Sequence, residues 1–389
     1  MTIKCYGKNR KMSELYKLPA GWEWIELEKI CGKASSNLSL KKIENEEGKY
    51  PLYGAKGFIK NISFFHREEP YISIIKDGAG VGRIMMLDGK SSIIGTLQYL
   101  LPKDNVKIKY LYYMLLVVDF SKYISGTTIP HIYYRDYKEQ LIPLPPLAEQ
   151  KRIVAKLDSL FEKIDKAIEL HQQNITNANT LMASTLDKTF KKLEGEYKSK
   201  LLSQLTKTTS GGTPKRDTKE FWGGEIGWLK SGELNDSYIN DVEEFITEEG
   251  VKKSSAKILP KGTLLMAMYG ATVGRLGILN IETTTNQAVC AILNNENNFE
   301  TKYLFYFLKN IRKDMLRDSF GGAQPNISQT YIKAIEVPTP PLQIQQQTVE
   351  YLDSIATKVD KIKQLNEQKL ENLKALKASI LDKAFRGEL

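Results

Sequence analysis

The chain has 389 residues, which is too long for one ordinary core, so we expect two or more domains. With 41% hydrophobic and 26% charged residues, and no apolar run near the ~18 residues of a membrane span, the composition indicates a globular protein and argues against a membrane protein. The first twenty residues lack the apolar centre of a signal peptide, and the scattered Cys5, Cys31 and Cys290 form no C-x-x-C pair. We therefore expect a cytoplasmic protein without disulfides.

The net charge of +10 is unevenly distributed. Residues 1–141 hold 22 Lys and Arg against 15 Asp and Glu, a balance of +7, whereas 142–195, 196–336 and 337–389 each come to +1. A basic excess attracts phosphate backbones, although many soluble proteins are mildly basic. The charge makes nucleic acid a candidate partner and does not by itself establish it.

The part before residue 142 combines short β-like runs with a helix. Glycine and aspartate turns bound the strands that we expect at 71–76, 82–88 and 97–102, and an apolar helix follows at 109–118. The part between 196 and 337 repeats this order, with strands at 262–269, 274–280 and 286–293 and a helix at 302–311. Both parts are predicted to be α/β units of one fold with different surfaces.

A repeat connects the two halves of the chain. Ile142–Phe190 aligns without gaps on Val337–Phe385, at a shift of 195 residues, and 22 of the 49 positions are identical, far above chance. The segments before each long helix also match in the same order. GAGVGR at Gly78–Arg83 corresponds to GATVGR at Gly270–Arg275. We conclude that the chain is a tandem duplication with a first variable unit at 1–142, a long helix at 143–195, a second variable unit at 196–337 and a C-terminal long helix at 338–389.

Each constant segment predicts one long helix. The Pro-Pro pairs at 145–146 and 340–341 suit a helix start, and no further proline or glycine occurs until about residue 193 or 386. Apolar residues then recur at spacings of three and four, typical of a coiled-coil seam, so two helices of about 40 residues are expected to be partners. A two-fold relation between the halves would make them antiparallel. The expected seam residues are Val154, Leu157, Phe161, Ile164, Ile168, His171, Leu352, Ile355, Val359, Ile362, Asn366 and Leu373.

His171 and Asn366 occupy equivalent positions and interrupt the apolar seam near its midpoint. One hypothesis is that the two side chains face each other and set the register of the helices. The alternative is that both lean out to solvent.

Both variable units carry glycine-rich loops with Lys, Arg, Tyr, Asn and Gln. Arg and Lys suit guanine and phosphates, and Asn and Gln suit adenine. The alternative for each loop, taken alone, is an ordinary turn. An acidic stretch at Glu243–Gly250 is expected to face away from DNA or toward a partner subunit. The candidate DNA-binding residues are Tyr53, Lys56, Lys76, Arg83, Thr127, His131, Tyr134, Arg135, Thr213, Lys215, Arg216, Lys230, Tyr269, Arg275, Gln324 and Asn326.

Motifs for catalysis are not found. The run DGAGVG is similar to a G-x-G cofactor loop, but Gly80 is Thr272 in the second copy, which favours a turn between strands. Glu149 and Lys151 are not kept in the second copy, so no nuclease site is implied. There is no phosphate loop of the G-x-x-x-x-G-K-[ST] type, no adenine-methylase signature and no clustering of the three histidines. We predict no catalytic residues and no metal site.

Several segments resemble the specificity subunit of Type I restriction-modification enzymes. They are LPAGWEWIELEKI at 18–30, SGGTPKRDTKEFWGGEIGWLKSGEL at 210–234, and the paired PLPPLAEQKRIVAKLD and PTPPLQIQQQTVEYLD. The resemblance covers nearly the whole chain. It implies two target-recognition domains that each read half of a split site in double-stranded DNA, separated by an antiparallel helical spacer. It also implies two methyltransferase subunits and restriction (motor and nuclease) subunits as partners, with S-adenosylmethionine, ATP and Mg on those partners and no cofactor on this chain.

Geometry adds an expectation of its own. Two rigidly spaced modules that read major grooves on one face of DNA favour half-sites about one turn, ~10 bp, apart. Because the two units differ in sequence, the predicted site is bipartite and asymmetric. Two other interpretations stay open at this point: a stand-alone DNA-binding regulator built by duplication, and an enzyme whose catalytic residues have no recognisable motif.

Overall fold

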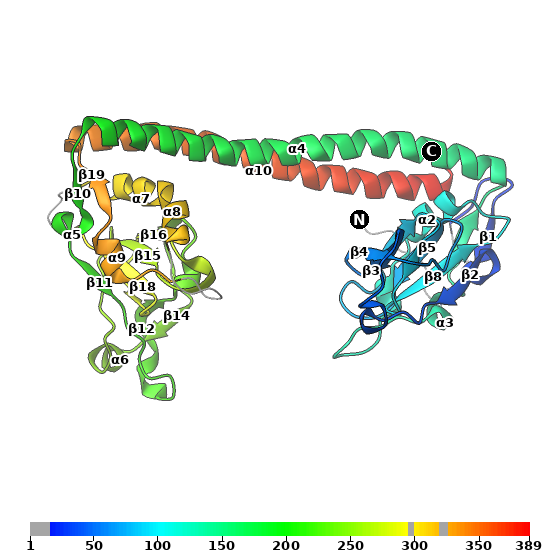
Figure 1. Ribbon diagram of the computed structural model, residues 1–389, viewed down its shortest axis with the longest axis horizontal. Helices are drawn as coiled ribbons and strands as arrows, with labels where there is room; N and C mark the ends of the chain where they lie inside the picture. Colours follow the sequence, from blue (N-terminus) through cyan, green and yellow to red (C-terminus); the bar gives the residue numbers. More distant parts are fainter. Residues whose placement is uncertain (1–15, 295–298, 319–325) are drawn as a thin grey trace. The chain divides into compact units, whose positions relative to one another are not determined.

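The computed structural model describes residues 16–294, 299–318 and 326–389. The chain divides into two compact units, one made of 1–172 and 367–389 and the other of 173–366. Two long helices, α4 (Leu147–Glu196) and α10 (Leu342–Arg386), contribute one half each to both units (Figure 1). Each unit therefore consists of a globular part and a segment of the helix pair. Among the described helices, none has the length and apolar character that crossing a membrane requires.

The globular part of the first unit is built on two sheets. A four-stranded sheet has the order β2-β8-β5-β6, a three-stranded sheet has the order β4-β3-β7, and β1 pairs separately with β9. The elements are β1 (Glu23–Glu26), α1 (Leu27–Ile30), β2 (Cys31–Ser35), η2 (Leu40–Ile43), β3 (Tyr50–Gly54), β4 (Gly57–Ile62), β5 (Tyr71–Ile75), β6 (Ile84–Leu87), β7 (Ser92–Ile93), β8 (Leu97–Pro102), α2 (Ile108–Leu115), η3 (Phe120–Tyr123), α3 (Tyr134–Tyr137) and β9 (Leu141–Leu144).

The second unit has the same topology with one additional strand. Its larger sheet has the order β11-β18-β15-β16-β13, its smaller sheet β14-β12-β17, and β10 pairs with β19. The elements are β10 (Ser199–Leu201), α5 (Leu202–Leu205), β11 (Thr208–Ser210), η4 (Lys219–Phe221), β12 (Trp222–Leu229), η5 (Ser231–Glu233), β13 (Ser237–Ile239), β14 (Glu244–Ile246), α6 (Glu248–Lys252), β15 (Leu264–Ala267), η6 (Gly270–Thr272), β16 (Leu276–Leu279), β17 (Thr284–Thr285), β18 (Val289–Ile292), α7 (Thr301–Asn310), α8 (Arg312–Arg317), α9 (Gln329–Lys333) and β19 (Glu336–Pro338).

The strands expected from the sequence are confirmed in both units. The central strands β5 and β15 are buried at every position, which explains why their sequences are almost continuously apolar. The helix expected at 109–118 is shorter than predicted, because α2 ends at Leu115 and the β-branched Val117 and Val118 lie in the turn that follows.

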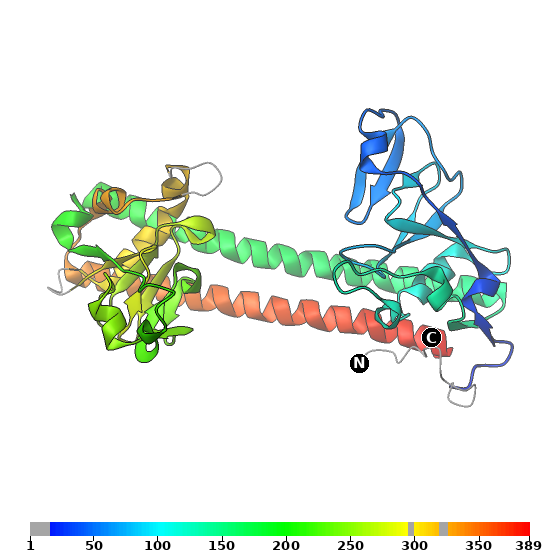
Figure 2. The same ribbon diagram turned by 90° about the horizontal axis from the view of Figure 1, so that it is seen from below.

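Within each unit, α4 and α10 run antiparallel and lie side by side (Figure 1, Figure 2). In the first unit, Lys377 on α10 donates to Asp165 on α4 at 2.5 Å, and Arg152, earlier on α4, donates to the carbonyl of Leu389, just after α10, at 2.7 Å. Later positions of the C-terminal segment thus meet earlier positions of α4. In the second unit, the side chain of Thr339, just before α10, donates to the carbonyl of Lys198, just after α4. The antiparallel pair expected from the repeat is confirmed in each unit.

The seam between the helices follows the predicted spacing with one exception. Leu157, Phe161, Ile164, Leu352 and Val359 are buried, whereas Ile362 is 39% exposed. Seam positions are spaced by three or four residues, and from Val359 this spacing leads to residues 363 and 366. Ile362 therefore lies beside the seam and not in it. The prediction is therefore wrong for Ile362.

Asn366 has a defined partner on the other helix. Its side-chain oxygen accepts a hydrogen bond from Asn174 at 3.3 Å, and its amide donates to the carbonyl of Ile362 at 2.7 Å. A polar contact between the two helices thus lies at this seam position. The pairing of Asn366 with His171 itself stays a prediction.

The globular part of each unit packs on the end of one long helix as well as on the start of the other. In the second unit, Phe190 near the end of α4 is fully buried, with ring centroids 5.5 Å from Tyr303 and 5.3 Å from Phe307 on α7. In the first unit, Phe385 near the end of α10 lies 5.4 Å from Tyr110 on α2. These packing contacts explain why both copies of the repeat carry phenylalanine at this position.

A buried glutamine in each copy caps the helix of the globular part. The side-chain oxygen of Gln150 accepts from the backbone amide of Lys107, before α2, at 2.8 Å. Gln345 accepts in the same way from Glu300, before α7, at 2.9 Å. These bonds satisfy helix N-terminal amides that have no intrahelical acceptor, so the Pro-Pro-Leu-x-x-Gln motif has a structural role.

An aspartate makes a second repeated link between helix and globular part. Asp158 accepts from the Lys109 ammonium at 2.7 Å and from the Tyr113 hydroxyl at 2.6 Å. Asp353 accepts in the same way from Lys302 and Tyr306, both at 2.6 Å at their shortest. Both globular parts are thus held on the long helices by the same set of contacts.

Candidate functional site

The three candidate loops of the first unit converge in space. The guanidinium of Arg83 donates to the carbonyl of Ala55, which joins the Gly-rich loop 76–83 to the β3–β4 turn. The same loop pairs with the loop 125–135, because Gly78 donates to the carbonyl of Pro130 at 2.9 Å and Asp77 forms a β-bridge with His131. Three loops that are separate in sequence are thereby brought together on one side of the sheet ends.

The corresponding loops of the second unit converge in the same manner. Tyr269 in the Gly-rich loop forms a β-bridge with Asn326, just as Asp77 does with His131. The hydroxyl of Thr213 donates to Gln287, and the carbonyl of Ala288 accepts from the amide of Met268 at 2.8 Å, which links a further loop to the group. The two units therefore present equivalent loop clusters with different side chains.

The structure corrects one candidate residue of the first unit. Tyr134 is only 8% exposed, and its hydroxyl donates to the carbonyl of Cys31 at 2.5 Å, so it cannot reach a ligand and the prediction is wrong. Its neighbour Tyr133 is 43% exposed and lies against His131 and beneath Arg135. Tyr134 is buried together with Tyr137 where α3 packs. Tyr133 lies four residues before Tyr137, so helical spacing in the sequence does not separate the two tyrosines.

The remaining described candidates all reach the surface, and Gln324 lies outside the described residues. Exposed or half-buried side chains are those of Tyr53, Lys56, Lys76, Arg83, Thr127, His131, Arg135, Thr213, Lys215, Arg216, Lys230, Tyr269, Arg275 and Asn326. Their contact with DNA stays a prediction.

The DGAGVG run is a turn between strands, as predicted. The amide of Gly82 donates to the carbonyl of Ile75 and the amide of Ile75 donates to the carbonyl of Arg83, which closes a hairpin between β5 and β6. Gly78, Gly80 and Gly82 all have positive φ, a conformation that glycine adopts at little cost. The glycines are accounted for by the turn.

A half-buried ion pair holds the equivalent turn of the second unit. Arg312, from α8, donates to the carbonyl of Gly274 and to both oxygens of Asp236, at 2.8 Å from Nη1. Asp236 also accepts from the amide of Leu276 at 3.0 Å. Burial by itself raises the pKa of the Asp236 carboxyl, but the bonds from Arg312 and Leu276 outweigh it and hold the pKa below its usual range.

We expect Asp236→Asn to destabilise the second unit by about 2–3 kcal/mol at pH 7, because a charge-assisted bond to a partly buried guanidinium is lost. Because the folded-state pKa is depressed, the carboxylate stabilises the fold above the unfolded-state pKa, and this contribution is lost as pH falls through the folded-state value. Thermal unfolding of both proteins between pH 7 and pH 2 checks this. A difference in stability that persists undiminished at pH 2 would contradict it.

The acidic stretch begins against two candidate cations. Glu243 and Glu244 contact the ammonium of Lys230 at 2.9 and 3.0 Å, and Glu244 also accepts from Arg216 at 2.5 Å. The first two positions of the stretch thus lie beside candidate DNA-binding residues, and its orientation toward DNA or a partner subunit stays a prediction. Glu248, by contrast, is exposed and pairs with Lys252 on its own helix.

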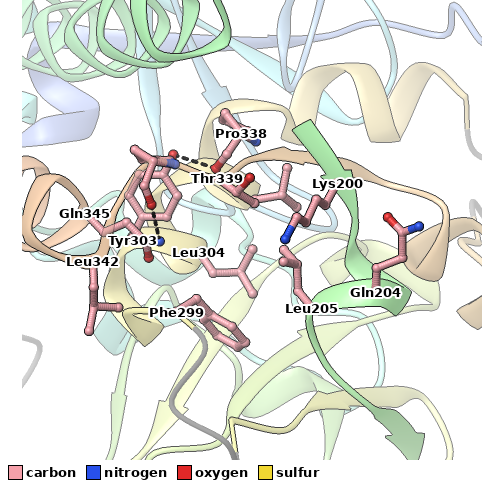
Figure 3. A pocket seen from close by; sticks show the side chains of 12 residues that line it. Lys200, Gln204, Leu205, Phe299, Tyr303, Leu304, Pro338, Thr339, Leu342 and Gln345 are labelled. Carbon is pink, nitrogen blue, oxygen red and sulfur yellow. Dashed lines mark hydrogen bonds between the residues drawn. The ribbon is translucent and has the colours of Figure 1, made fainter. Parts of the chain in front are cut away.

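A cavity of about 360 Å³ lies in the second unit beside the Pro-Pro corner. Figure 3 shows that its polar lining includes Tyr303 and Gln345, whose polar ends bond to the carbonyls of Pro338 and Pro340. Lys200 and Gln204 come from β10 and α5. This set contains no pair of acid and base, and the described part of the chain holds no group of three metal-ligating side chains.

The long helices carry a second repeated feature on their outer faces. Nine positions of α4, spaced by three or four residues, lie within about 80° of one helix face at 100° per residue and are all identical in α10. The leucines among them are exposed, at 58% for Leu170, 50% for Leu181, 51% for Leu365 and 46% for Leu376. We call this set the repeated stripe; it comprises Ser159, Lys163, Lys166, Leu170, Gln173, Asn177, Leu181, Ser184 and Lys188, with Ser354, Lys358, Lys361, Leu365, Gln368, Asn372, Leu376, Ser379 and Lys383.

Folding does not explain the repeated stripe. Except for the half-buried Ser184, its members are exposed in both helices. Neighbouring exposed positions have diverged between the copies, as Ala155 and Glu350 or Lys156 and Tyr351 show. The paired exposed leucines, alike in two diverged copies, make the repeated stripe a candidate interaction surface.

Comparison with known proteins agrees with the repeat. A family model described as the Type I restriction modification DNA specificity domain matches residues 19–178 and again 194–374. The specificity subunit of the Type I enzymes EcoR124I and EcoR124II of Escherichia coli is 25% identical over 379 residues, covering 90% of this chain and 91% of that protein. The MjaVIII specificity subunit of Methanocaldococcus jannaschii is 25% identical, covering 100% of this chain and 98% of its own length.

Solved structures share the fold. A chain from a study of assembly and conformational transition of the Type I restriction-modification system superposes with a TM-score of 0.74 at 21% identity, over 96% of this chain and all of that one. The HsdS subunit from Thermoanaerobacter tengcongensis gives a TM-score of 0.52 at 21% identity, over 97% of this chain and all of its own.

Proposed function

We propose that this chain, which belongs to the Type I restriction modification DNA specificity domain family, is the specificity subunit of a Type I restriction-modification enzyme. In this proposal it directs the enzyme to an asymmetric bipartite DNA site. As a specificity subunit it is a non-catalytic component of a Type I restriction-modification complex and recognises DNA. The regulator interpretation has no support from the proteins that the chain is similar to.

The observation that carries the proposal is the matching convergence of loops in two units of one fold. The bridge between Asp77 and His131 and the bridge between Tyr269 and Asn326 bring equivalent loops together. The side chains presented are different, so each unit is suited to a different half-site, and half-sites about one helical turn apart are expected.

The repeated stripe supports a role in assembly. Two like surfaces on one chain fit two copies of one partner, and we assign them to two methyltransferase subunits. Exposed leucines with lysines on either side suit an amphipathic partner helix with acidic flanks. The restriction subunits, and S-adenosylmethionine, ATP and Mg on the partner subunits, belong to this proposal, as does action in the cytoplasm, where the DNA substrate lies.

Methylome sequencing of the host with and without this gene tests the proposal. We expect one family of methylated adenines, in a split and asymmetric motif, to disappear when the gene is deleted. Purification of the tagged chain is expected to bring down a methyltransferase. An unchanged methylome together with a single continuous binding site in a selection would refute the proposal in favour of a regulator.

A further inference from the structure

Arg216 is held in a rigid and half-exposed position within the loop cluster of the second unit. Its guanidinium carbon lies 3.9 Å from the ring centroid of Trp222 and 4.6 Å from that of Trp228, and 51% of the side chain is exposed. A planar guanidinium stacked on aromatic rings keeps its charge and loses little further freedom on binding.

The two tryptophans are themselves fixed. Trp228 is 2% exposed and its indole donates to the carbonyl of Gly212 at 2.8 Å, while the Trp222 indole donates to the carbonyl of Lys215 at 3.2 Å. The two rings meet edge to face at 5.0 Å between centroids. The segment just before Arg216 is therefore tied to β12 at two points, Gly212 and Lys215.

Glu244 orients the guanidinium further. Its carboxylate accepts from Nη1 at 2.5 Å and also contacts Lys230 at 3.0 Å. The bond to Glu244 uses one edge of the guanidinium, and the described part of the chain places no acceptor on the Nη2–Nε edge. That edge has the two parallel N–H groups that match O6 and N7 of guanine.

The surrounding charge favours a base over a phosphate as the ligand. Glu243 and Glu244 neutralise Lys230 and Arg216, so this part of the surface has little attraction for a phosphate backbone. The guanidinium beside these carboxylates still has two parallel N–H groups that can bond O6 and N7 of guanine, which distinguishes guanine from the other bases.

We propose that Arg216 reads one guanine in the half-site of the second unit, with Glu244 and Trp222 as positioning residues. The inference rests on the proposed function and adds the residue and the base. Lys215, exposed beside it and without such contacts among the described residues, is not assigned a base.

The test uses the full chain in its complex with the methyltransferase and the duplex identified by methylome sequencing. Arg216→Lys is expected to weaken binding of that duplex by about 10- to 100-fold and to remove the preference at one G·C pair. The slope of log affinity against log salt should not change, because the charge remains and no phosphate contact is lost. Glu244→Gln should relax the preference at the same pair by a smaller factor.

A second experiment changes the DNA, so its main result does not depend on whether a protein variant folds. Replacing each guanine of the half-site in turn by 7-deazaguanine should weaken wild-type binding strongly at one position, and Arg216→Lys should be insensitive there. Arg317→Lys, in an exposed pair with Asp314 on α8, is the matched control and should leave every preference intact.

Unchanged base preferences in both variants would overturn the assignment. A loss of affinity that is equal for all sequences would overturn it in favour of a phosphate contact. If the wild-type complex itself shows no bipartite preference, the proposed function fails and not merely the role of Arg216.

Discussion

Leu181→Glu combined with Leu376→Glu should abolish co-purification of the methyltransferase while the chain still folds. Both leucines are about half exposed on the outer faces of α4 and α10 and belong to the repeated stripe. If the stripe binds partner helices, each substitution buries an unpaired carboxylate in an apolar contact, which we expect to cost roughly 100-fold or more in affinity. Size-exclusion chromatography and calorimetric titration with the purified partner measure the loss.

The duplication offers a matched control. Ala155→Glu introduces the same charge on the same helix, at an exposed position where the second copy already carries Glu350. It should leave the affinity for the partner unchanged. Single substitutions at Leu181 or Leu376 should each remove one of two bound partners. Full binding by the double variant would show that the stripe has another role.

Phe190→Ala should destabilise the second unit by about 3–5 kcal/mol, because a fully buried aromatic ring is removed from a packed core. Phe190 follows the first globular part in the chain, but its ring packs on Tyr303 and Phe307. Hydrogen exchange should therefore accelerate in α7 and its neighbours and stay unchanged in α2.

Phe385→Ala is the reciprocal case. Its ring packs on Tyr110, so exchange should accelerate in α2 and not in α7. Each half of the repeat thus completes the core of the other half's globular part. If Phe190→Ala instead loosened α2, the packing described for the second unit would be wrong.

Local patterns predicted much of the fold. The Pro-Pro pairs located the starts of both long helices. Apolar residues spaced by three or four located most of the seam between them. The short apolar runs correspond to β5, β6, β8 and their counterparts in the second unit. Comparing the two copies also predicted that DGAGVG is a turn. These features depend on residues that are close in sequence, so their spacing is sufficient evidence.

The candidate surface was less predictable. Tyr133 and Tyr134 are adjacent and chemically alike, and only the packing of α3 decides that the first is exposed and the second buried. Glu243 and Glu244 meet Arg216 and Lys230 because β14 pairs with β12, a contact between segments that sequence spacing does not reveal.

By itself, the sequence determined that the chain is a duplication, that each copy joins an α/β unit to a long helix, and that no catalytic motif is present. Those conclusions follow from periodicity, breaker residues and identity between copies. The tertiary structure alone decided which repeated residues serve folding and which face outward. Phe190, Gln150 and Asp158 are used within the fold, whereas the repeated stripe is exposed, because burial depends on contacts between distant segments.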